Sequence, residues 1–86
     1  MTKIHFTKHA KEKFRVLARH GVVITEKKVS QTVRFPEHID NSRNPLVIAQ
    51  SRLNHNHVLR VVYKIEEGII IIITFYPGRT SQYEKN

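Results

Sequence analysis

Four basic side chains and one tyrosine in the second half of the chain have the types and spacing that phosphate chemistry needs. Arg52, Arg60 and Lys64 lie on two β-rich segments, and Arg79 is followed four residues later by Tyr83. A guanidinium group offers a planar set of donors to a phosphate, and a tyrosine can stack on a base or hydrogen-bond a ribose or phosphate. Such a set could bind RNA. Without a metal, it could also stabilise the charge that develops when a ribose 2′-hydroxyl attacks the neighbouring phosphate.

The same residues allow a plainer interpretation, in which they are ordinary exposed side chains of a basic protein. Fifteen lysines and arginines stand against seven acidic residues, which gives a formal net charge of +8. A domain this basic favours polyanions, either nucleic acid or an acidic protein partner, through long-range attraction and counterion release. We therefore expect a polyanion-binding surface, with solubility alone as the alternative.

The sequence gives little support for a metal site, for histidine acid–base catalysis or for a known nucleophile or phosphate-loop motif. His55 and His57 stand two residues apart, but no partner ligand is found at metal-binding spacing, and a solvated hairpin tip is the simpler interpretation. His9, in the first turn of an expected helix, is more typical of a capping or packing residue than of an acid or base. The chain has no cysteine, glycine-rich phosphate loop, Ser-His-Asp pattern or carboxylate pair. We expect no metal and no cofactor.

Capping residues predict two helices in the first half of the chain. Thr7 can cap a helix that runs to about Arg19, after which Gly21 can end it in a left-handed conformation. Thr25 begins a second helix by the same logic, and Pro36 ends it. The chain of 86 residues is long enough for one small domain, which we expect to span residues 1–86.

The strands are predicted on either side of these helices. Residues 3–6 alternate polar and apolar side chains, as a short half-buried strand does, and residues 37–44 are typical of a loop. Three β-rich runs follow at 46–53, 57–65 and 69–76. Because the connections between them are short, they should form an antiparallel meander.

The register of the last hairpin decides which residues face the helices. If residues 66–68 form a three-residue loop, Ile65 faces Ile69, and pairing back along both strands makes one face wholly apolar or aromatic. The helices should cover that face. Its members would be Leu59, Val61, Tyr63, Ile65, Ile69, Ile71, Ile73 and Phe75.

The opposite face of the meander should be open and basic. It would carry Arg60 and Lys64 on one strand. On the preceding strand the same parity places Arg52 and Gln50 on the open face, because burying them would be costly without partners. Val47, Ala49, Ser51 and Leu53 would then face inward.

Five consecutive isoleucines, residues 69–73, form the centre of the last expected strand. The run is far shorter than the ~20 residues that span a bilayer, so we expect no membrane partner. The start of the chain has no apolar stretch after its basic residues, which favours a cytoplasmic protein over one with a signal peptide. The strand should end by delivering Arg79 toward Arg60.

The order of elements, one short motif and two residues after the last strand resemble the RelE/ParE toxin superfamily. The motif is L-R-V-V-Y at 59–63, which contains Arg60, and the two later residues are Arg79 and Tyr83. The resemblance implies an α+β fold in which helices pack on one face of a small antiparallel sheet. It also implies that Arg60, Arg79 and Tyr83 are the candidate catalytic residues. Arg52 stands where ribonuclease members carry basic residues, although a neighbouring basic residue is missing here.

Residues 5 to 76 are more closely similar to a RelE-like group of bacterial domains of unknown function. The likeness is carried by His9-Ala10, Lys13 where arginine is usual, Gly21-Val22, Pro36 and the closing strand IITFY. These motifs are short and mostly structural, so they bear on the fold. Relatives in the superfamily include ribosome-dependent mRNA endoribonucleases, gyrase inhibitors and members without known activity.

The resemblance implies the toxin of a bacterial type II toxin–antitoxin pair, a metal-independent endoribonuclease acting on mRNA in the ribosome. Its partners would be a cognate antitoxin, mRNA and the ribosome, in a homo-oligomer or a toxin–antitoxin hetero-oligomer. Arg52, His57 and Lys64 would hold the RNA backbone. Two alternatives stay open: a non-catalytic basic module that binds nucleic acid or an acidic protein, and a toxin directed at gyrase.

Overall fold

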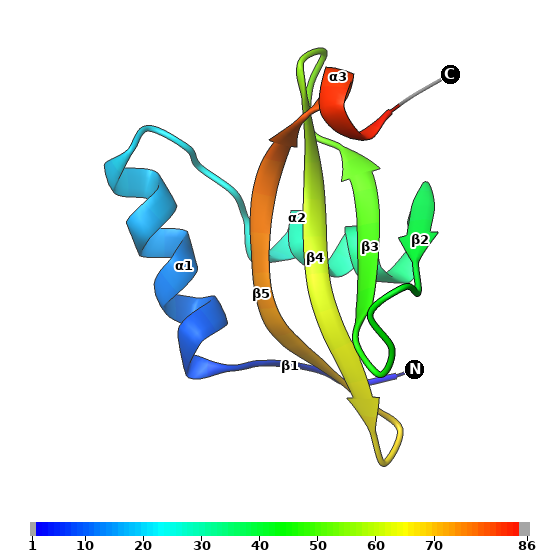
Figure 1. The fold of residues 1–86 in the computed structure, drawn as a ribbon. Helices are drawn as coiled ribbons and strands as arrows, with labels where there is room; N and C mark the ends of the chain where they lie inside the picture. The colour runs from blue at the N-terminus through cyan, green and yellow to red at the C-terminus, as the bar shows by residue number, and fades with distance from the viewer. Residues whose placement is uncertain (1, 85–86) are drawn as a thin grey trace.

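The computed structural model describes residues 2–84, which form two longer capped helices, a curved sheet and a short third helix (Figure 1). In chain order the elements are β1 (Ile4–Phe6), α1 (Lys8–Arg19), α2 (Glu26–Arg34), β2 (His38–Asp40), β3 (Val47–Arg52), β4 (His57–Glu66), β5 (Ile69–Arg79) and α3 (Thr80–Tyr83). Figure 1 shows α2 crossing behind the long strands, with α1 beside β5. In the described part of the chain, no helix is both long and apolar enough to cross a membrane.

The two longer helices begin and end at the predicted residues. Thr7 caps α1 by accepting a hydrogen bond from the backbone N–H of Ala10, at 3.2 Å. Thr25 caps α2 in the same way, accepting from the backbone N–H of Lys28 at 3.1 Å. Gly21 follows α1 with φ +80°, a conformation that side chains other than glycine rarely adopt. The capping analysis of the sequence is confirmed.

The sheet is larger than the predicted meander. Its five strands lie in the order β1-β5-β4-β3-β2, and β1 runs parallel to β5 while the other pairs are antiparallel. The meander β3–β4–β5 is present within it. The prediction of a loop over residues 37–44 is wrong for His38–Asp40, which form the edge strand β2 against β3. Three residues are too few for alternation to stand out from a polar loop.

The hairpin between β4 and β5 has a shorter turn than predicted. Glu67 and Gly68 both have positive φ, +50° and +76°, as a two-residue type I′ turn requires. Ile65 therefore pairs with Ile70 rather than with Ile69, and Glu66 pairs with Ile69. The predicted three-residue loop is wrong because Glu67 accepts a left-handed conformation that its side chain disfavours.

This change of register reverses which of the isoleucines in β5 face the core. Ile72 is fully buried in the core, and the half-buried Ile70 packs against the core. Ile69, Ile71 and Ile73 are also half-buried but do not belong to the core cluster. The expectation that the odd-numbered isoleucines face the helices is thus wrong, because slipping the pairing by one residue exchanges the two faces. Ile65 is also wrongly placed inside, since it is 61% exposed.

A β-bulge restores the predicted phase beyond the isoleucines. The pairing shifts between Val62 and Tyr63, so that Tyr63 lies opposite Ile72 but Val62 lies opposite Thr74. One extra residue on β5 reverses the alternation of the strand again. Phe75, Leu59, Val61 and Tyr63 accordingly lie in the core, as the sequence predicts.

The core fills the space between the sheet and the two longer helices. Phe75 is fully buried and its ring centroid lies 4.5 Å from that of Phe14 on α1. From β3, Ala49 joins the same cluster and Ser51 meets Thr32 of α2 through hydroxyl groups 2.6 Å apart, which confirms the inward parity of this strand. The opposite face of the sheet is left for Arg60 and its surroundings.

Candidate functional site

Arg60 is the centre of a polar cluster on the sheet face that α1 and α2 leave uncovered. Its neighbours on β4, Leu59 and Val61, lie in the core, so alternation turns Arg60 to the other face. Its Nε donates to the hydroxyl of Tyr76 at 3.0 Å, and its Nη1 donates to Gln50 Oε1 at 2.6 Å. The side chain is only 11% exposed. Arg60 is therefore a largely desolvated cation held in one orientation.

A carboxylate from the edge strand β2 balances part of this charge. Asp40 Oδ2 lies 3.5 Å from Arg60 Nη2. Hydrogen bonds from the side chain and backbone of Ser42 hold the pKa of Asp40 below its usual value, and the charge of Arg60 adds to that lowering. Asp40 is thus ionised at neutral pH. A pocket of about 190 Å³ opens here, lined by His38, Ile39, Asp40, Ile48, Gln50, Arg60 and Tyr83.

Tyr83 lies over Arg60, as a result of the turn that α3 makes after β5. The guanidinium carbon of Arg60 is 4.2 Å from the centroid of the Tyr83 ring, within the range of a cation–π contact. A glycine at position 78 makes this approach possible. A Cβ added to Gly78 would stand 2.3 Å from Cε2 of the Tyr83 ring, closer than such atoms can come.

Replacing Gly78 by alanine is therefore expected to push the Tyr83 ring off Arg60. The backbone of Gly78 does not have positive φ, so the effect should be steric and local. The measurement is the ring-current shift of the Arg60 side-chain protons by NMR, which Gly78→Ala should reduce as strongly as Tyr83→Leu does. Tyr83→Phe keeps the ring and serves as the control. An unchanged shift in Gly78→Ala would contradict this account of the contact.

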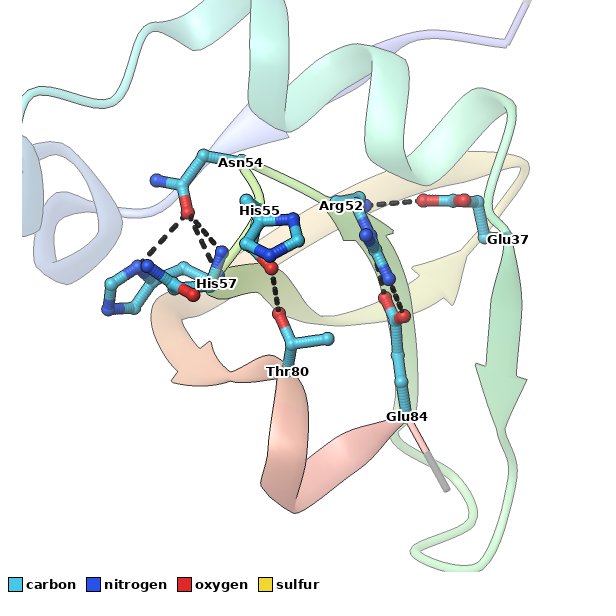
Figure 2. A network of polar contacts seen from close by, with 8 residues as sticks. Glu37, Arg52, Asn54, His55, His57, Thr80 and Glu84 are labelled. Atoms are coloured by element: carbon cyan, nitrogen blue, oxygen red, sulfur yellow. Dashed lines mark hydrogen bonds and ion pairs between the residues drawn. The ribbon is translucent and has the colours of Figure 1, made fainter. Parts of the chain in front are cut away.

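Arg52 closes the same edge of the site through an ion pair with the C-terminal segment. Its guanidinium contacts the carboxylate of Glu84, with Nε 3.3 Å from Oε2, while its backbone N–H donates to Glu37 (Figure 2). The hydrogen bond between the two side chains raises the pKa of Arg52 and lowers that of Glu84. The positive charges of Arg52 and Arg60 are thus both covered by the segment that begins at Thr80.

This ion pair is expected to make the position of the C-terminal segment depend on pH. Because the pKa of Glu84 is lowered, the pair contributes fully above the ordinary pKa of a glutamate and is lost as the pH falls through the lowered value. The ring-current shift on Arg60 should persist at neutral pH and decrease in strong acid. Glu84→Gln should weaken it already at neutral pH, whereas Glu66→Gln, a carboxylate paired with Lys64, should not. Acid sensitivity retained by Glu84→Gln would show that another group is responsible.

The predicted site residues fall into three separate places. Arg60 and Tyr83 meet, with Arg52 near them through Glu84. Lys64 shares the face of Arg60 but stands four residues further along β4, about 13 Å away at ~3.3 Å per residue, and pairs with Glu66 at 2.6 Å.

Arg79 does not approach Arg60, contrary to the expectation from the sequence. It pairs with His57 across the two strands, while Arg60 pairs with Tyr76. Arg79 is three residues beyond Tyr76, an odd number, so alternation puts Arg79 and His57 on the face of Leu59 and away from Arg60. These two residues line a different pocket.

Two neighbours of Arg60 were not found by sequence reasoning: His38 and Asp40. The sequence places Gln50 and Tyr76 on the face of Arg60 but does not name them as its partners. His38 and Asp40 belong to β2, which looks like a loop in the sequence. Their only signal is the polar-apolar-polar order of residues 38–40. Within residues 2–84, no group of three or more His, Asp or Glu side chains is placed to hold a metal ion.

The fold and the site define a small α+β protein with a mixed five-stranded sheet and an arginine-centred pocket on one face. A particular likeness is to a conserved hypothetical protein, HP0894 from Helicobacter pylori, with a TM-score of 0.50 and 18% sequence identity. The match covers 94% of this chain and 97% of that one, and at this identity it bears on the fold alone. No protein-family description and no curated protein matches the chain.

Proposed function

We propose that the protein is the toxin of a bacterial type II toxin–antitoxin pair and cleaves mRNA in the ribosome without a metal. The observation that carries the proposal is the state of Arg60: 11% exposed, oriented by Gln50 and Tyr76, and set beneath Tyr83 at a pocket. A preorganised cation in a poorly solvated site stabilises developing negative charge far better than a cation in water. The likeness of motifs to the RelE/ParE superfamily supports the same function.

In this proposal Arg60 stabilises the phosphate as the ribose 2′-hydroxyl attacks it, and Tyr83 stacks on a nucleotide. Of the five N–H donors of a guanidinium, one is directed at Tyr76 and one at Gln50, and Nη2 lies 3.5 Å from Asp40 Oδ2. Arg60 therefore still retains donors for a phosphate. Arg52 and Lys64 hold the RNA backbone on the same face. Because Glu84 and Tyr83 cover Arg52 and Arg60, RNA has to move the C-terminal segment aside when it binds.

The formal net charge of +8 supports the partners that the proposal names. A strongly basic domain is attracted to mRNA and to the ribosome, and its neutralisation calls for an acidic antitoxin. The two proteins would form a hetero-oligomer in which the antitoxin covers part of the basic surface.

One observation favours a second candidate, a non-catalytic basic module that binds RNA or an acidic protein. The charge of Arg60 already has Asp40 as a counterion, with Oδ2 at 3.5 Å from Nη2, as in a structural ion pair. In that case Arg60 would hold β2 and β4 together rather than act on a phosphate.

Induced expression of the full chain in a bacterial host separates these functions. The proposed toxin should arrest growth, and mapping of mRNA 5′ ends should show new ends within translated regions. A binding module should leave growth and mRNA intact, yet bind RNA with an affinity that falls steeply with salt. A DNA-damage response without new mRNA ends would indicate a toxin directed at gyrase. Either of the last two results rejects the ribonuclease.

A further inference from the structure

The tip of the β3–β4 hairpin orients the ring of His57 so that its Nδ1 faces the side-chain oxygen of Asn54. Asn54 Oδ1 lies 2.9 Å from the backbone nitrogens of Asn56 and His57 and 3.1 Å from His57 Nδ1 (Figure 2). The two backbone N–H groups are donors, so the atom of Asn54 that faces them has to be its oxygen. An oxygen only accepts, and Nδ1 must therefore carry the proton. In the neutral ring, Nε2 is left with a free lone pair.

Arg79 stands beside this histidine with its charge available. It lies directly across the strand pair from His57 and is exposed. Among residues 2–84, no carboxylate comes within ion-pair distance of Arg79. This contrasts with Arg52 and Arg60, each of which has a carboxylate partner.

His57 and Arg79 both line a pocket of about 390 Å³, and hydrogen bonds connect the two segments that form its walls. It is lined by Asn56, His57, Arg79, Thr80 and Ser81, none of them acidic. The backbone N–H of Thr80 donates to the carbonyl of Asn56 at 2.9 Å, and its hydroxyl donates to the carbonyl of His55 at 3.3 Å (Figure 2). The start of α3 is thereby held against the hairpin tip, which keeps Arg79 and His57 on one wall.

An acceptor nitrogen next to an unpaired cation matches a hydroxyl donor next to an anion. The 2′-hydroxyl and 3′-phosphate of a ribonucleotide have this arrangement, and DNA lacks the hydroxyl. We propose that this pocket binds the 2′-hydroxyl and 3′-phosphate of an RNA nucleotide, with His57 Nε2 accepting from the hydroxyl and Arg79 donating to the phosphate. Asn54 is a positioning residue that acts through the ring of His57.

The proposal rests on the proposed function in one respect, that the ligand is RNA, and it adds a contact that distinguishes RNA from DNA. The pocket is separate from the one at Arg60, on the other face of the same sheet end. It therefore requires RNA to be held at two places, whether or not the chain cleaves it.

The test is an NMR titration of the full chain with adenosine 3′-monophosphate and with its 2′-deoxy form. Neither ligand has a second nucleotide attached to its 3′-phosphate, so neither can be cleaved. At about pH 7.5 the amide signals of Asn56, Thr80 and Ser81 should shift. The ribonucleotide should bind about 3- to 10-fold more tightly, as expected for one hydrogen bond. The 2′-O-methyl form, which cannot donate, should bind like the deoxynucleotide.

Variants assign the contact to its residues. His57→Phe should bring the two affinities together, and Arg79→Ala should weaken both. His55→Phe, on the same hairpin but outside the pocket, and Arg15→Ala, which removes one exposed positive charge from α1, should leave the ratio unchanged. The comparison of ligands uses the wild-type chain, so it decides the matter even where a variant does not fold.

Equal affinity of the wild type for the ribo and deoxy forms would overturn the proposal, as would shifts centred on Arg60 and Tyr83. A preserved ratio in folded His57→Phe would overturn the role of Nε2. These outcomes are independent of the growth assay. A harmless chain with intact mRNA rejects the ribonuclease while a measured ribonucleotide preference still supports this site, and a toxic chain without that preference rejects this site alone.

Discussion

Arg60→Ala is expected to abolish the proposed growth arrest and to lower the proposed mRNA cleavage by at least about a hundredfold. That is the loss typical of removing one preorganised donor from a developing oxyanion. Arg60→Lys should recover little of the activity, because an ammonium keeps the charge but not the planar fork that Gln50 and Tyr76 orient. The measurements are colony formation on induction and the yield of new mRNA 5′ ends.

The controls for Arg60 separate chemistry from folding. Arg60→Ala leaves the 4% exposed Gln50 without its donor, which should cost about 1–3 kcal/mol of stability. Circular dichroism should therefore show a folded chain with a lower melting temperature. Arg15→Ala, an exposed arginine on α1, should stay fully toxic. Full toxicity of a folded Arg60→Ala chain would exclude Arg60 from the proposed active site.

Phe75→Ala is expected to lower the free energy of unfolding by about 3–5 kcal/mol, the range for removing a fully buried phenylalanine. The cavity would lie between β5 and α1, where the ring of Phe75 meets that of Phe14. In a domain of this size such a loss takes most of the stability, so the variant should be largely unfolded at 37 °C. Urea unfolding followed by circular dichroism measures it.

The matched control for Phe75 is another phenylalanine. Phe35 follows α2 and is 77% exposed, so Phe35→Ala should change the free energy of unfolding by no more than about 0.5 kcal/mol. Similar losses for both variants would mean that the core does not lie where the structure places it.

Local signals in the sequence were sufficient for the helices and for most of the core. Thr7 and Thr25 cap helices because their hydroxyls reach backbone N–H groups three residues on, which depends on neighbouring residues alone. The burial of Leu59 and Val61 follows from strand alternation, which is also local. The α+β class and the β3–β4–β5 meander could therefore be predicted.

The isoleucine strand shows where local reasoning stops. The face that Ile72 occupies depends on whether the preceding turn has two or three residues, and Glu67 decides this by adopting a positive φ. Phe75 lies inward only because a bulge beyond Val62 restores the alternation. Neither event leaves a mark on the order of residues in β5 itself, since each depends on how two strands pair.

For the candidate site, too, some features follow from the sequence and others only from the tertiary structure. The sequence by itself determined that Arg60 lies on a strand face away from the core and that Tyr83 follows the last strand closely enough to be a candidate partner. Only the tertiary structure decided that Tyr83 reaches Arg60 over Gly78, that β2 adds Asp40, and that Arg79 belongs with His57 instead. The physical reason is that a side chain's face follows from a period of two residues, whereas its neighbours across the sheet follow from long-range register.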